Sequence, residues 1–87
     1  MFKVNQTTGS GFQMTFSNGW TVSVQWGPST YSDNYNAGSF EKGMTSKTAE
    51  IGAWDDQGNW HQFEGDTVMG WVHPDQVANF IALIANK

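Results

Sequence analysis

Apolar and polar side chains alternate along residues 12–26, FQMTFSNGWTVSVQW. Alternation with a period of two is typical of a β-strand that buries one face. Asn18-Gly19 interrupts the alternation, and this dipeptide favours the positive φ angles of a tight hairpin turn. The pattern therefore predicts two antiparallel strands joined by a short turn. We expect one face of this hairpin to carry Phe12, Met14, Phe16, Trp20, Val22, Val24 and Trp26.

Further strands and one helix are expected outside the hairpin. Short runs bounded by turn residues predict strands at residues 2–5, 48–54, 59–63 and 67–72. Pro74 lacks a backbone N–H, which the first position of a helix does not need, so a helix is expected over residues 74–86. Turns are expected at residues 55–58 and 64–66, where Gly, Asp and Glu gather.

Apolar residues of the expected helix share one face. They stand three and four positions apart and are Val77, Phe80, Ile81 and Ile84. We expect this stripe to pack on the sheet against Val22 and Val24. The predicted fold class is therefore α+β: an antiparallel sheet of four to five strands with one C-terminal helix packed on one face. A chain of 87 residues has room for one domain, so residues 1–87 are expected to form a single domain.

Aromatic residues are abundant for so short a chain, with five Trp, six Phe and two Tyr. Each large ring buries roughly 150–250 Å² in a core. A small core does not hold all of these rings, so some are expected at a ligand site or at a subunit interface. We therefore expect a homo-oligomer, most simply a two-fold dimer.

The charged residues narrow the range of partners. The net charge is −4, the basic residues are four Lys, and Arg and Cys are absent. Arg is the usual bidentate clamp for phosphate, and proteins that bind duplex nucleic acid normally carry a basic stripe, so duplex binding is not expected. Lack of Cys excludes disulfides and fits a reducing compartment. No apolar run approaches the roughly 20 residues that span a membrane. A cytoplasmic protein without a membrane partner is expected.

Residues with catalytic or metal-binding chemistry do not form a recognisable pattern. His61 and His73 lack the additional ligands at short spacing that a zinc site needs. Asp55 and Asp56 lie in a sequence that does not match a calcium loop, so a hairpin turn is expected there. No G-x-S-x-G elbow or phosphate-binding loop occurs. We expect no metal and no cofactor, and binding is favoured over catalysis.

The best candidate site is the loop of residues 27–47. Tyr can stack on a flat base, Asn can bond a base edge, and Lys can neutralise a phosphate. This combination suits one small anionic ligand, although a loop that only solubilises the protein is the alternative. Trp54 is a possible wall, or the partner of Trp60 in a cross-strand pair. The candidate ligand-binding residues are Tyr31, Asn34, Tyr35, Lys42, Lys47, Trp26 and Trp54.

Three segments resemble a group of small uncharacterised accessory proteins of tailed phages, notably cyanophages. They are GFQMTFSNGWTVSVQW, TAEIGAWDDQGNW and V-x-GWV-x-P-x-x-V-x-x-FI, which cover residues 11–26, 48–60 and 68–81. The resemblance brings no catalytic residue with it. It implies an accessory protein that acts in the cytoplasm of an infected host cell.

Three functions are compatible with these observations. The first is a protein that binds and sequesters a small ligand without catalysis, such as a nucleotide of defence signalling. The second is an inhibitor or structural adaptor that binds a host protein, in which the same Tyr residues would be the anchors. The third is a small hydrolase. The first is the expected function because no group of residues has a convincing acid, base, nucleophile or metal-binding role.

Overall fold

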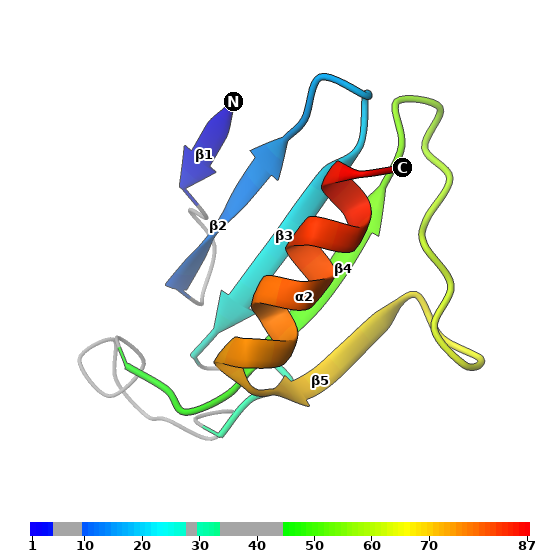
Figure 1. Ribbon diagram of the computed structural model, residues 1–87. Helices are drawn as coiled ribbons and strands as arrows, with labels where there is room; N and C mark the ends of the chain where they lie inside the picture. Colours follow the sequence, from blue (N-terminus) through cyan, green and yellow to red (C-terminus); the bar gives the residue numbers. More distant parts are fainter. Residues whose placement is uncertain (5–9, 28–29, 34–44) are drawn as a thin grey trace.

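The protein folds as an open antiparallel sheet with one helix packed against it, as seen in a computed structural model (Figure 1). The structure describes residues 1–4, 10–27, 30–33 and 45–87. The fold class predicted from the sequence is confirmed. The strands lie in sequence order across the sheet, and they are β1 (Phe2–Val4), β2 (Ser10–Thr15), β3 (Thr21–Trp26), β4 (Ala49–Trp54) and β5 (Val68–Val72), followed by the helix α2 (Pro74–Ala85).

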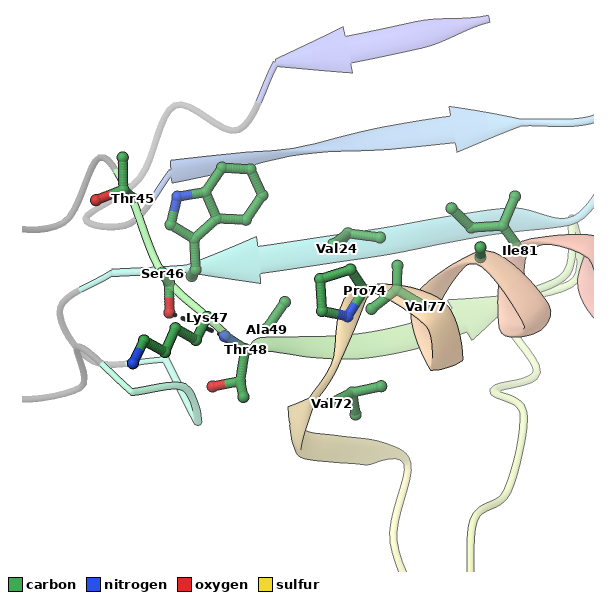
Figure 2. Close-up of a pocket in the computed structure, with 12 residues that line it drawn as sticks. Val24, Thr45, Ser46, Lys47, Thr48, Ala49, Val72, Pro74, Val77 and Ile81 are labelled. Atoms are coloured by element: carbon green, nitrogen blue, oxygen red, sulfur yellow. Dashed lines mark hydrogen bonds between the residues drawn. The ribbon is translucent and has the colours of Figure 1, made fainter.

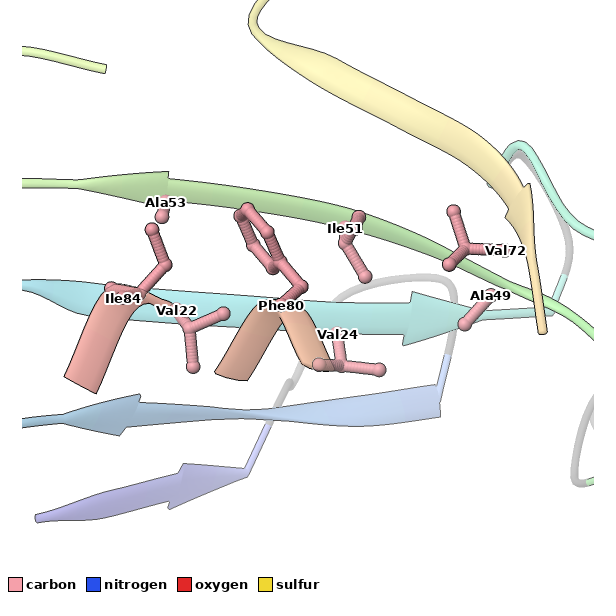
Figure 3. Close-up of a cluster of buried hydrophobic side chains, with 8 residues drawn as sticks. All are labelled: Val22, Val24, Ala49, Ile51, Ala53, Val72, Phe80 and Ile84. Carbon is pink, nitrogen blue, oxygen red and sulfur yellow. The ribbon is translucent and has the colours of Figure 1, made fainter. Parts of the chain in front are cut away.

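The core lies between α2 and the two central strands, β3 and β4 (Figure 3). The register places Val22 opposite Ala53 and Val24 opposite Ile51, so all four side chains point toward the helix. From α2, Phe80 and Ile84 complete the buried cluster. The expected contact of the helix with Val22 and Val24 is confirmed, whereas Val77 and Ile81 are only half-buried. Alternation along each strand therefore determines which face receives the helix.

Both ends of α2 are held by polar contacts. The backbone N–H of His73 donates to Oε1 of Gln76 over 3.1 Å and so secures the first turn. At the other end, Nδ2 of Asn18 donates to the backbone oxygen of Ile84 over 2.9 Å. The β2–β3 turn therefore binds the last carbonyls of the helix, which have no partner within it. In the described parts of the chain, no helix has the length and apolar character that crossing a membrane requires.

The β2–β3 turn differs in detail from the prediction. Gly19 alone has a positive φ, at 88°, and its N–H donates to the backbone oxygen of Phe16 over 3.0 Å. The positive φ expected for Asn18 is not observed. The side chain of Asn18 binds the end of α2. The Asn-Gly dipeptide thus fixes a tertiary contact as well as a turn.

The predicted strand at residues 59–63 is wrong. Only isolated bridges form there, from Trp54 to Trp60 and from Phe63 to Asp66. The N–H of His61 donates to the backbone oxygen of Ala53 over 2.8 Å, and the chain then leaves the edge of β4. The rings of His61 and Phe63 pack on Phe80 of the helix, at centroid distances of 5.4 and 5.3 Å. β5 instead pairs with the first half of β4, from Ala49 to Gly52.

A β-bulge changes the alternation of β5. Ala49 pairs with Val72 and Ile51 pairs with Met69, so one residue of β4 faces both Gly70 and Trp71. Because of the extra residue, the side chain of Val72 points into the core, where it is 3 % exposed. Trp71 has a φ of 52°, a conformation that bulky residues rarely adopt.

Candidate ligand-binding pocket

A pocket of about 440 Å³ opens between the first two turns of α2 and the neighbouring ends of β3 and β4 (Figure 2). Most of its wall is apolar. Figure 2 shows Val77 and Ile81 of the helix facing Val24 of β3 across the pocket. The volume lies within the roughly 300–1,000 Å³ of small-molecule sites. The residues that line it are Val24, Trp26, Thr45, Ser46, Lys47, Thr48, Ala49, Val72, Pro74, Val77, Ala78 and Ile81.

Small side chains explain why the pocket stays open. Ala49 on the sheet and Ala78 on the helix line it, and neither is long enough to fill the space between the two layers. Further along the helix, the larger Phe80 and Ile84 close the same space and form the core. The helix therefore packs tightly over its second half and leaves a recess beside its first half.

Residues 45–48 form the polar rim of the pocket. Thr48 is buried and anchors the rim, because its hydroxyl donates to Oδ1 of Asp33 and accepts the N–H of Asp33, each over 2.9 Å. Ser46 Oγ accepts the N–H of Thr48 over 3.3 Å. Lys47 is exposed, and Figure 2 shows its amine at the rim, directed away from α2. Among the described lining residues it is the only charged one, so an anionic group at the mouth would meet a cation.

The structure places the predicted site residues in three locations. Trp26 and Lys47 line the same pocket. Tyr31 lies against Gly70 and Trp71, in contact with β5 rather than with the pocket. Trp54 ends β4 and contacts Trp60, with 4.8 Å between ring centroids, which confirms the cross-strand aromatic pair. Asn34, Tyr35 and Lys42 lie outside the described residues.

The apolar wall was not predicted from the sequence. Val24, Val77 and Ile81 were assigned to the core because their spacing fits a buried face, yet they also line a recess. One signal was present: Ala occurs at position 49 in a strand and at position 78 in the helix, where larger residues would fill the space. Composition alone does not show that the two alanines lie on the same pocket.

Two of the described residues, His61 and Asp55, have a shifted pKa, and both lie outside the pocket. Burial, together with the charge of Lys87, lowers the pKa of His61 below its usual range and so favours the neutral imidazole. The backbone N–H of Asn59, which donates to Oδ1 of Asp55 over 2.8 Å, lowers the pKa of that carboxyl. Within the described segments, no three His, Asp or Glu residues lie close enough to hold a metal ion. The described lining residues of the pocket offer hydroxyls, the amine of Lys47 and an apolar wall, which are groups that bind a ligand.

Comparisons of the chain with protein-family models, with curated proteins and with solved structures gave no match.

Proposed function

We propose that the protein binds and sequesters a small ligand that has an apolar or aromatic body and one anionic group. The observation that carries this proposal is the apolar pocket of about 440 Å³ with Trp26 in its wall and Lys47 at its rim. Burying the body of the ligand supplies affinity at roughly 25 cal/mol per Å² of apolar surface. The amine of Lys47 adds attraction for the anionic group and so selects among ligands of similar shape.

A nucleotide of defence signalling is the specific form of this proposal that the phage resemblance suggests. A base would lie against the indole of Trp26, and one phosphate would approach Lys47. Base–aromatic stacking contributes roughly 1–3 kcal/mol.

Incubation with a panel of cyclic and linear nucleotides, followed by denaturation and chromatography, distinguishes sequestration from hydrolysis. Intact nucleotide recovered from the protein supports sequestration, whereas a new product indicates a hydrolase.

Changing Lys47 to Ala is expected to weaken the binding of an anionic ligand more than that of an uncharged one. Naphthaleneacetate and its uncharged amide share an aromatic body and differ in one charge, and calorimetry measures the affinity of the protein for each. We expect Lys47→Ala to lower affinity for the acid about three- to tenfold, because an exposed ion pair contributes roughly 0.2–1 kcal/mol and a partly desolvated one more. Affinity for the amide should stay within about twofold. Equal losses for acid and amide would contradict the role of Lys47.

Filling the pocket provides a matched pair of variants. Ala78 lines the pocket and is exposed, so Ala78→Phe should block it without disturbing the core and should abolish binding of both probes. Leu83 lies on the same helix, is 53 % exposed and does not line the pocket, so Leu83→Phe should leave binding unchanged. Unaltered binding by Ala78→Phe would place the ligand elsewhere.

Assembly as a homodimer is a second proposal, favoured by one exposed surface. Phe2 and Val4 of β1 are 76 % and 70 % exposed, and the register places them opposite Met14 and Phe12 of β2 on the helix side of the sheet. In Figure 1, α2 lies over β3 and β4 and leaves β1 and β2 uncovered. These four side chains are apolar and uncharged, so the surface is complementary to itself. A second copy related by two-fold symmetry is therefore the occupant we propose.

The dimer proposal predicts the effect of a charge on β1. Phe2→Glu should convert a dimer mass into a monomer mass in light scattering at micromolar concentration, because two carboxylates would meet in an apolar interface. Lys3 alternates onto the other face of the sheet, so Lys3→Glu is the control and should leave the dimer intact. A monomer mass for the unmodified protein would exclude this assembly.

A further inference from the structure

The face of the sheet opposite α2 carries uncharged hydrogen-bonding side chains on its two neighbouring strands, β2 and β3. Gln13 pairs with Ser23, and Thr15 pairs with Thr21, so their side chains point away from the helix. The hydroxyls of Thr15 and Thr21 are 2.9 Å apart, and Nε2 of Gln25 donates to Oγ of Ser23 over 3.0 Å. Thr21 and Ser23 are only 9 % and 6 % exposed, so the half-buried Gln13, Thr15 and Gln25 present the polar groups of this face to solvent.

An aromatic ring lies on the same face over β4. The indole of Trp60 covers Gly52, since a Cβ built on that glycine would stand 3.1 Å from Cζ3 of Trp60. Trp54 contacts this indole, at 4.8 Å between centroids. Trp60 is 42 % exposed, so one side of the ring lies on the sheet and part of its surface faces solvent.

A second pair of rings continues this surface at β5. Tyr31 packs directly on Gly70, where an added Cβ would stand 2.4 Å from Cβ of Tyr31. Trp71 stacks on Tyr31, at 5.6 Å between centroids and an interplanar angle of 23°. The β-bulge brings Trp71 to this face, and its N–H donates to the backbone oxygen of Tyr31 over 2.8 Å. The two side chains remain 45 % and 54 % exposed.

The two aromatic pairs lie on neighbouring strands, one over the second half of β4 and the other at β5 beside Glu50 of β4. The backbone N–H of Tyr31 donates a hydrogen bond to Oε2 of Glu50 over 3.1 Å. Trp60 lies over Gly52, and Trp54 is two residues further on. Glu50, Gly52 and Trp54 alternate onto the same face and span about 13 Å of β4. The aromatic strip (Tyr31, Trp71, Trp60 and Trp54) follows them across β4 and β5.

We infer that this face binds a neutral oligosaccharide. Sugar rings present flat C–H surfaces that stack on exposed aromatic rings, and they carry hydroxyls that bond amide, hydroxyl and carboxylate groups. The face offers both kinds of partner: the aromatic strip, and beside it Gln13, Gln25 and Glu50. The carboxylate of Glu50 is a good acceptor for a sugar hydroxyl but repels phosphate, so a neutral glycan fits better than a nucleic acid.

The backbone of Trp71 allows a clean test of this inference. Its φ of 52° is tolerated by Asn better than by most residues, so Trp71→Asn removes the ring without adding backbone strain. Electrophoresis in native gels that contain neutral α-1,4-, β-1,3- or β-1,4-glucan measures binding as slower migration. We expect at least one glucan to retard the protein, and Trp71→Asn and Trp60→Ala each to weaken this binding about tenfold.

Controls come from the helix side of the sheet. Phe2→Ala removes an exposed ring from the other face, and Lys47→Ala changes the pocket, so neither should alter retardation by the glucan. Thermal melting confirms that each variant is folded. The inference is overturned if none of the glucans retards the protein, if folded Trp71→Asn and Trp60→Ala bind as well as the unmodified protein, or if a Pro-rich peptide binds the strip and no glucan does.

Discussion

Changing Ile84 to Asp is expected to destabilise the protein severely. Ile84 is fully buried, and Figure 3 shows it beside Val22 and Ala53 in the contact between the last turn of α2 and the sheet. An unpaired carboxylate at this position, together with the lost apolar contacts, should cost about 4 kcal/mol or more, which is most of the stability of a small domain. Circular dichroism during heating should show no cooperative transition, or one lowered by about 20 °C.

The neighbouring residue supplies the control. Leu83 is 53 % exposed on the same turn of α2, so Leu83→Asp should change the melting temperature by a few degrees at most. Ile81→Asp should fall between the two, because Ile81 is half-buried and lines the pocket. Equal melting temperatures for Ile84→Asp and Leu83→Asp would show that α2 does not pack as described.

Changing Gly11 to Ala is expected to have the second largest effect. Gly11 has a φ of 148°, and an added Cβ would stand 2.1 Å from the backbone oxygen of Val24 and 2.9 Å from Cα of Gln25. The backbone atoms of β3 cannot move away without breaking the β2–β3 pairing. The strained φ and the clash together should lower the free energy of unfolding by about 3 kcal/mol, measured by urea denaturation.

Gly52 is a matched control within the same sheet. A Cβ at Gly52 would approach the end of the Trp60 ring at 3.1 Å, and this ring lies on the surface where it can shift. Gly52→Ala should therefore cost about 1 kcal/mol or less while displacing Trp60. A stable Gly11→Ala variant, with an unfolding midpoint near that of the unmodified protein, would contradict the register of β2 and β3.

The fold could be predicted from the sequence where side-chain spacing alone determines which face is buried. The alternation of residues 12–26 and the spacing of Phe80 and Ile84 predict the central hairpin and the helix, and both are present. The same reasoning predicts a strand at residues 59–63, where the structure has only isolated bridges. Its rings are suited to a strand, but His61 and Phe63 contact Phe80, a residue distant in sequence. Tertiary packing therefore overrides a local pattern there.

The candidate site was less predictable because a recess depends on the distance between two layers. Trp26 and Lys47 were chosen for their chemistry, and both line the pocket, but nothing in their spacing indicates the alanines at positions 49 and 78 beside them. The position of Tyr31 depends on the bulge in β5 and on Gly70, which together bring Trp71 to the same face. A bulge shifts the alternation by one residue, and no pattern in the strand itself marks it.

The indole N–H signals of the five tryptophans test the central claim directly. In a two-dimensional NMR titration with naphthaleneacetate, the indole signal of Trp26 should shift and saturate, because among the tryptophans only Trp26 is one of the described lining residues of the pocket. The signals of Trp54, Trp60 and Trp71, which lie on the other face of the sheet, should stay in place. A saturating shift of those three signals with no change at Trp26, or no shift at any tryptophan, would contradict a ligand site beside the start of α2.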